Sequence, residues 1–136
     1  CDTFAGHAAV DADLDGEHAQ EDKFADVSAD EVRDYLDGES VEVVAGDIME
    51  TADRIPGGAI GFLHLDVDVY PPTKFCLDHF SSQMPVGSMI VVDDYGFVTC
   101  AGAKQAVDEF IDDHPNWRRL HLITGQALLV HTGASS

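Results

Sequence analysis

The chain has 136 residues, 45% of them hydrophobic, which suits one folded domain with a core and excludes a disordered protein. Its 26 acidic residues outnumber 7 basic ones, and the formal net charge of −19 disfavours nucleic acid and anionic membranes as partners. The acidic residues are dispersed along the chain and lysines are few, which is typical of proteins from salt-accumulating halophiles. An ordinary acidic domain is the alternative.

Neither the first residues nor the cysteines have the pattern of a signal peptide or of a zinc site. No apolar run approaches the roughly 18 residues of a membrane span. No basic region followed by an apolar stretch stands at the start, so we expect no signal peptide. Cys1, Cys76 and Cys100 have no zinc-ligand spacing, so we expect reduced thiols in a cytoplasmic protein. The first residue is cysteine, not methionine, and we therefore expect a fragment or a processed product.

The first third of the chain predicts little regular structure. Residues 1–27 are polar and acidic, and we expect an irregular surface segment. Ser28 and Glu31 have the spacing of a capping box, which predicts a helix that begins there and ends at Gly38. A short strand is predicted at 41–45, followed by a weak helical turn at 50–54.

The rest of the chain alternates apolar strands with helices. Strands are predicted at 60–65 (IGFLHL) and 89–92 (MIVV), and runs this continuous suit a sheet covered on both faces. Helices are predicted at 73–83, with Pro72 in the first turn, and at 103–113, where apolar residues follow helical spacing. Strands at 120–123 and 127–131 complete the list as an antiparallel hairpin at the sheet edge. This order predicts an α/β fold with a mostly parallel, Rossmann-like sheet in a single domain.

Carboxylates follow two of the buried strands. Asp66 and Asp68 come after one strand, and Asp93 and Asp94 come after the next. Because the carboxyl ends of parallel strands meet at one edge of a sheet, these acids should lie together and need a cation or a proton. Oxygen-only ligands suit Mg²⁺, Mn²⁺ or Ca²⁺. The alternative is that Asp66 and Asp93 only cap the helices that follow.

Other polar and aromatic residues near these strands carry weaker signals. His64 alternates with Asp66 in an apolar strand, so we expect a core histidine and not a ligand. Tyr70 and Tyr95 follow the acid pairs and either wall a pocket or pack in the core. Trp117 is expected in the core or at an interface.

Six short stretches, in the same order, resemble the macrocin O-methyltransferase family, which belongs to the class I S-adenosylmethionine (SAM) methyltransferases. They are 1–6 (CDTFAG), 43–47 (VVAGD) with Thr51, 65–70 (LDVDVY) with Thr73, 85–87 (PVG), 91–96 (VVDDYG) and 106–110 (AVDEF). The resemblance implies an enzyme that methylates a hydroxyl of a small molecule of sugar or aromatic natural-product type. It also implies a class I methyltransferase fold, here truncated at its N-terminus, and a homo-oligomer is possible.

The resemblance implies roles for six aspartates. Asp66, Asp93 and Asp94 would hold Mg²⁺ or Mn²⁺, and Asp68 would be the general base for the acceptor hydroxyl. The cofactor ribose and adenine would lie near Asp2 and Asp47. The chain departs from the family pattern because it contains no glycine-rich SAM loop, and Val67 replaces the glycine between the two acids.

Three rival functions also account for part of the pattern. A haloacid-dehalogenase-like phosphatase shares the D-x-D of Asp66 and Asp68, but its lysine segment is not found. A metal-dependent nucleotide-sugar transferase also uses D-x-D, but leaves Asp93 and Asp94 unexplained. The third is a truncated methyltransferase-like domain without activity.

Overall fold

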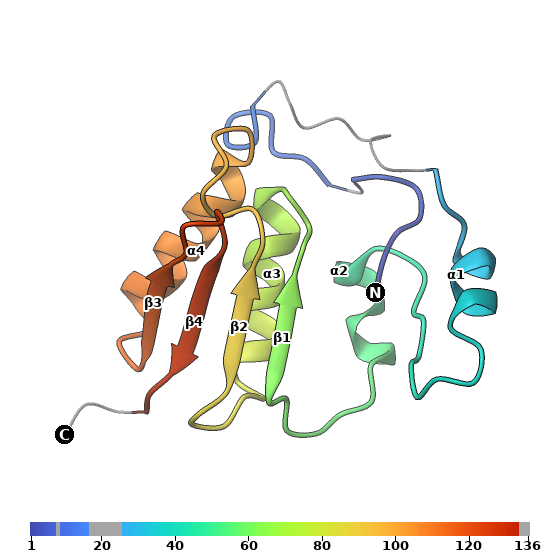
Figure 1. Ribbon diagram of the computed structural model, residues 1–136. Coiled ribbons are helices and arrows are strands. Elements are labelled where there is room, and N and C mark those ends of the chain that lie inside the picture. Colours follow the sequence, from blue (N-terminus) through green and yellow to red (C-terminus); the bar gives the residue numbers. More distant parts are fainter. Residues whose placement is uncertain (8, 17–25, 134–136) are drawn as a thin grey trace.

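The computed structural model describes residues 1–7, 9–16 and 26–133 (Figure 1). Its elements in chain order are α1 (Ala29–Tyr35), α2 (Ile48–Thr51), the 3₁₀ turn η1 (Ala52–Arg54), β1 (Phe62–Leu65), α3 (Tyr70–Ser81), β2 (Met89–Val92), α4 (Ala101–Asp113), β3 (Trp117–His121) and β4 (Ala127–His131). Within these ranges, no helix has the length and apolar character needed to cross a membrane.

The sheet has four strands in the order β1-β2-β4-β3. β1 and β2 are parallel, whereas β4 runs antiparallel to both β2 and β3. The predicted edge hairpin is therefore confirmed, but the prediction of a mostly parallel sheet is wrong for the described residues. A short turn returns the chain from β3 into β4, and such a connection can only join antiparallel strands.

Helices α3 and α4 cover one face of this sheet and leave the other face open (Figure 1). The covered face holds the core, whose largest fully buried side chains include Leu77 on α3, Phe110 on α4 and Ile90 on β2. On the opposite face, Phe62 of β1 is 59% exposed and its partner Met89 is 40% exposed. The prediction that both faces are covered is thus wrong for the described part of the chain.

Several element boundaries differ from the predicted ones. α3 begins at Tyr70, three residues early, because prolines are tolerated in a first turn, whose N–H groups have no partner within the helix. β3 begins at Trp117, since an edge strand accommodates the exposed Arg118 and Arg119. The strand predicted at 41–45 is reduced to one isolated parallel bridge, between Asp2 and Ala45.

The start of α1 follows the predicted capping box. The Ser28 hydroxyl accepts a hydrogen bond from the Glu31 N–H, and the Glu31 carboxylate accepts one from the Ser28 N–H. The residues described within 1–27 contain turns and the Asp2 bridge, as expected for an irregular segment. Residues 8 and 17–25 of that predicted segment lie outside the described ranges.

The excess of acidic residues predicts that salt raises the thermal stability of the fold. Raising KCl from about 0.1 M to about 1 M shortens the screening length from about 10 Å to about 3 Å. Because this weakens repulsion within a chain of net charge −19, the midpoint of thermal unfolding should rise by several degrees. Circular dichroism melts would measure this, with sucrose as the control, because sucrose is excluded from protein surfaces without screening charge. An equal rise in sucrose and KCl would contradict electrostatic repulsion as the cause.

Candidate metal and cofactor site

The carboxyl ends of β1 and β2 bring three aspartates together. Asp66 directly follows β1, and Asp93 and Asp94 directly follow β2. The parallel register continues past the strands, because the Asp93 N–H donates to the Leu65 carbonyl oxygen at 2.9 Å. One carboxylate oxygen from each of Asp66, Asp93 and Asp94 lies within 4.8 Å of the others. The structure therefore places the three predicted ligands in one cluster.

Proximity and burial make these carboxylates hard to ionise together. Burial raises the pKa of Asp66, and the charges of Asp93 and Asp68 raise it further. Burial, followed by the charges of Asp68 and Asp66, raises the pKa of Asp94 to about 7. Asp94 is only 7% exposed, and its Oδ2 has no hydrogen-bond partner among the described residues. A buried, unsatisfied carboxylate oxygen within an all-oxygen cluster fits a hard divalent cation such as Mg²⁺.

The alternative role for Asp66 and Asp93, as helix caps, does not agree with the structure. The N-cap residue of α3 is Val69 and that of α4 is Cys100, neither of which makes a side-chain cap bond. Asp93 instead accepts a hydrogen bond from the Gln126 amide at 2.9 Å. The two acids at the strand ends are thus not used to begin helices.

Asp68 occupies a strained turn between β1 and α3. Its φ is 59°, and the Val69 N–H donates to the Val67 carbonyl oxygen at 2.6 Å across it. A three-residue turn of this kind is rare and costs energy, and such strain is concentrated at functional sites. The Asp68 Oδ2 lies 2.9 Å from Nε2 of His7, which reaches it from the N-terminal segment. Sequence reasoning missed His7, because nothing in its irregular segment indicates a contact with a residue 61 positions away.

Asp2 and Asp47 lie across the cavity from the strand ends. The Asp2 N–H donates to Val44 and the Gly46 N–H donates to Asp2, which fixes the N-terminus beside the start of α2. Each carboxylate also has a local partner. Asp2 Oδ1 accepts from the Phe4 N–H at 2.7 Å, and Asp47 Oδ1 caps α2 through the Met49 N–H at 2.9 Å. Both side chains are thereby held in defined positions.

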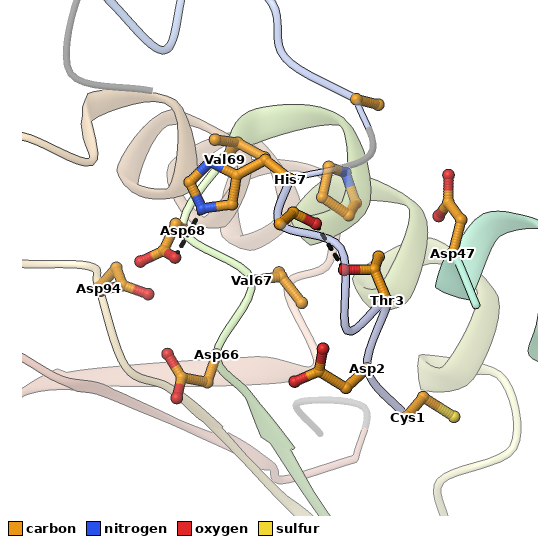
Figure 2. A pocket seen from close by; sticks show the side chains of 13 residues that line it. Cys1, Asp2, Thr3, His7, Asp47, Asp66, Val67, Asp68, Val69 and Asp94 are labelled. Atoms are coloured by element: carbon orange, nitrogen blue, oxygen red, sulfur yellow. Dashed lines mark hydrogen bonds and ion pairs between the residues drawn. The ribbon is translucent and has the colours of Figure 1, made fainter. Parts of the chain in front are cut away.

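A cavity of about 380 Å³ connects these groups. Figure 2 shows Asp66, Asp68 and Asp94 on one side of it and Asp2 with Thr3 on the other. Five aspartates line the cavity, namely Asp2, Asp47, Asp66, Asp68 and Asp94. Asp93 does not, since its carboxylate is directed to Gln126. So concentrated a negative charge favours positively charged ligands.

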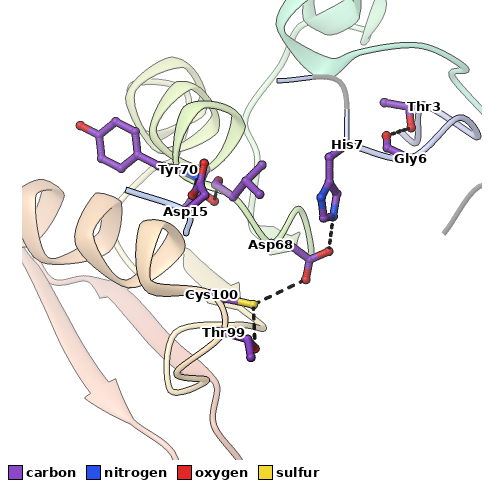
Figure 3. Close-up of polar contacts among 10 residues, drawn as sticks. Thr3, Gly6, His7, Asp15, Asp68, Tyr70, Thr99 and Cys100 are labelled. Carbon is purple, nitrogen blue, oxygen red and sulfur yellow. Dashed lines mark hydrogen bonds and ion pairs between the residues drawn. The ribbon is translucent and has the colours of Figure 1, made fainter. Parts of the chain in front are cut away.

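Asp15 connects the N-terminal segment that carries His7 to the start of α3. Asp15 is 4% exposed, and its Oδ1 accepts from the Tyr70 N–H at 2.6 Å, which supplies the cap that α3 otherwise lacks (Figure 3). Its Oδ2 accepts from the Asp11 N–H at 2.7 Å. α4 approaches closely at Gly102, where a β-carbon would lie 1.7 Å from Asp15 Oδ1. Asp15 was not predicted, because Tyr70 and Gly102, which it contacts, are distant from it in sequence.

The remaining predicted residues are mostly structural. Tyr70 donates its hydroxyl to Glu109, and Tyr95 donates to Asp108, so the two tyrosines pack against α4 and do not wall the cavity. Trp117 is 2% exposed and lies in the core, which is one of the two places expected for it. The prediction for His64 is wrong, because its side chain is 49% exposed, on the uncovered face, with Nε2 3.8 Å from Asp93 Oδ1.

Comparison with known sequences agrees with the resemblance of the motifs. The family model of macrocin O-methyltransferase (TylF) matches residues 1–128. Demethyldecarbamoylnovobiocin O-methyltransferase from Streptomyces niveus is 34% identical over 90 residues, which cover 62% of this chain and 33% of the relative.

Comparison with solved structures agrees with the fold. The O-methyltransferase NovP superposes with a TM-score of 0.79 at 25% identity, over 96% of this chain and 58% of NovP. The calicheamicin methyltransferase CalS11 shares the fold, with a TM-score of 0.69 at 23% identity, over 94% of this chain and 57% of CalS11. The chain thus spans a third of the curated relative and just over half of these two proteins.

Proposed function

Because the chain belongs to the macrocin O-methyltransferase family, we propose that it transfers the methyl group of SAM to a hydroxyl of a small molecule, with Mg²⁺ or Mn²⁺ held by Asp66, Asp93 and Asp94. The observation that carries the proposal is the group of five aspartates around one cavity at the sheet edge. Because the chain belongs to this family, the D-x-D motif of Asp66 and Asp68 is not assigned to a phosphatase or to a nucleotide-sugar transferase.

The metal proposal is supported by the donor set and by the state of Asp94. Three carboxylate oxygens within 4.8 Å of one another suit a hard cation, and the unpartnered Asp94 Oδ2 would gain a partner. A bound Mg²⁺ would orient the acceptor oxygen and favour its alkoxide by Lewis acidity. Besides burial, neighbouring carboxylates raise the pKa values of Asp66 and Asp94, and a bound cation would offset that negative charge.

Asp68 is our candidate for the base that accepts the hydroxyl proton. It lines the same cavity as Asp66 and Asp94, and His7 holds one of its oxygens. A hydrogen bond from the imidazole fixes the orientation of this carboxylate while its other oxygen, Oδ1, faces the Cys100 thiol. Positioning of this kind is the main contribution a protein makes to an in-line transfer.

The proposed cofactor site lies on the Asp2 and Asp47 side of the cavity. Carboxylates accept hydrogen bonds from ribose hydroxyls, and the negative charge of the cavity attracts the positive sulfonium of SAM. The proposed acceptor class is supported by the curated relative, whose name gives demethyldecarbamoylnovobiocin as its substrate. We therefore propose an aromatic or sugar-bearing natural product as the acceptor.

Calorimetric titration with S-adenosylhomocysteine, in about 1 M KCl with Mg²⁺, tests this proposal. We expect saturable binding, because S-adenosylhomocysteine, which is what remains of SAM after methyl transfer, keeps the adenosyl group with its ribose. Asp2→Asn should weaken binding roughly tenfold, which corresponds to about 1.4 kcal/mol. The exposed Asp112→Asn is the charge-matched control and should bind like the unmodified chain. A folded chain that binds no S-adenosylhomocysteine would overturn the proposal for this chain.

A further inference from the structure

A sulfur atom lies beside the acidic cluster. Cys100, the residue before α4, directs its Sγ at Asp68 Oδ1 at 3.9 Å (Figure 3). The other oxygen of the same carboxylate, Oδ2, lies 2.9 Å from His7 Nε2. Asp68 is therefore held between a thiol and an imidazole, and neither group belongs to the metal cluster of Asp66, Asp93 and Asp94.

Asp94 joins this arrangement. One ligand atom each from Asp68, Asp94 and Cys100 lies within 4.8 Å of the other two. Asp94 is only 7% exposed, and its Oδ2 has no hydrogen-bond partner among the described residues. A buried carboxylate oxygen without a donor is costly, and a cation would satisfy it. The unpartnered atom is thus an observation, separate from the cysteine, that indicates a bound cation.

The distances suit a single ion held by oxygen and sulfur. Zinc lies about 2.3 Å from a thiolate sulfur and about 2.0–2.2 Å from a carboxylate oxygen, so the two ligand atoms can be at most about 4.3–4.5 Å apart. The distance of 3.9 Å between Cys100 Sγ and Asp68 Oδ1 is within that limit. His7 would orient Asp68 through the second oxygen, as the hydrogen-bonded partners of metal ligands commonly do.

We propose that Asp68, Asp94 and Cys100 form a binding site for one thiophilic divalent cation such as Zn²⁺ or Co²⁺. Soft sulfur selects these ions over Mg²⁺, which prefers oxygen ligands alone. The site differs from the all-oxygen cluster in two of its three ligands and shares Asp94 with it. If the proposed function holds, an ion bound here occupies Asp68 and blocks its role as the base, so Zn²⁺ inhibits methyl transfer.

Absorption spectroscopy with Co²⁺ tests the site without any measurement of methyl transfer. A thiolate bound to Co²⁺ gives a charge-transfer band in the near ultraviolet, which oxygen ligands do not give. The titration uses a Cys1→Ser background, because the terminal amine and thiol of exposed Cys1 could chelate the ion themselves. We expect the band to saturate at one equivalent of Co²⁺ in Cys1→Ser and to be absent in Cys1→Ser/Cys100→Ser.

Two further variants locate the ion. In the Cys1→Ser background, His7→Ala should weaken Co²⁺ binding about ten- to a hundredfold, as expected for the partner of a ligand. Asp66→Asn should keep the band, because Asp66 belongs only to the all-oxygen cluster. No band in folded Cys1→Ser, a band that survives Cys100→Ser, or a band lost in Asp66→Asn would each overturn the proposal. Failure to bind S-adenosylhomocysteine would leave this result unaffected.

Discussion

Asp94→Asn is expected to stabilise the fold at pH 8 in metal-free buffer and to remove any stabilisation by Mg²⁺. The pKa of this buried carboxyl is raised to about 7 from its ordinary 3.8, chiefly by burial and then by Asp68 and Asp66. Below about pH 4 the group is protonated in both the folded and the unfolded chain, so it has no effect on stability. Between about pH 4 and pH 7 the unfolded chain releases a proton that the folded chain keeps, so stability falls as pH rises.

The size of this effect follows from the shift. Three pKa units correspond to about 4 kcal/mol of lost stability above pH 7, as an order of magnitude. Asparagine cannot ionise, so the advantage of the variant should be large at pH 8 and vanish near pH 4. Urea unfolding, followed by the fluorescence of the single tryptophan, Trp117, would measure it.

The same unfolding measurement, repeated with Mg²⁺, tests whether Asp94 is a metal ligand. A ligand that binds only the folded chain raises its stability, and Asp94→Asn should lose that response because a proposed ligand is gone. The control is Asp112→Asn, which removes one exposed charge from α4. A variant that is less stable than the unmodified chain at pH 8, or still stabilised by Mg²⁺, would contradict the role given to Asp94.

Gly102→Ala is expected to destabilise the chain, although alanine favours helices by about 1 kcal/mol over glycine. The added β-carbon would lie 1.7 Å from Asp15 Oδ1 and 2.9 Å from the β-carbon of Tyr70. Asp15 must then move and release the Tyr70 N–H that it caps. The net loss should be about 1–3 kcal/mol, the usual result of overpacking a buried contact.

A double-mutant cycle with Asp15→Ala separates this clash from a change in the helix itself. Asp15→Ala alone should cost about 0.5–2 kcal/mol, because α3 loses its cap. In that background Gly102→Ala should cost less than it does in the unmodified chain, since the carboxylate it would strike is gone. Equal costs in the two backgrounds would show that the contact between Asp15 and Gly102 does not determine the effect.

The sequence predicted the acids of the strand ends for a reason that the structure supports. Asp66 and Asp93 follow apolar runs, and the parallel register of β1 and β2 brings such positions together. His7, Asp15 and Cys100 act on partners 61, 55 and 32 positions away. The first two come from an irregular segment that has no period to reveal a facing residue, and Cys100 was judged only by its spacing to other cysteines.

The errors about the sheet have a shared physical cause. An apolar strand predicts burial, but the sequence of a strand does not say which neighbour supplies it. β1 is an edge strand in the described sheet, and one of its faces has no covering layer. His64 and Phe62 point to that face and are exposed for this reason, whereas Leu65 points to the helices and is 4% exposed.

The uncovered sheet face also determines how stability varies with temperature. Unfolding raises the heat capacity in proportion to the apolar surface it exposes, and a fully packed domain of this length would gain about 1.6–2.0 kcal/mol/K. Side chains that are already in water, such as Phe62 and Met89, contribute little to that gain. The heat-capacity change of this chain should therefore fall below that range, which gives a stability curve of low curvature. Such a chain loses little stability on cooling, and its cold denaturation moves to lower temperature.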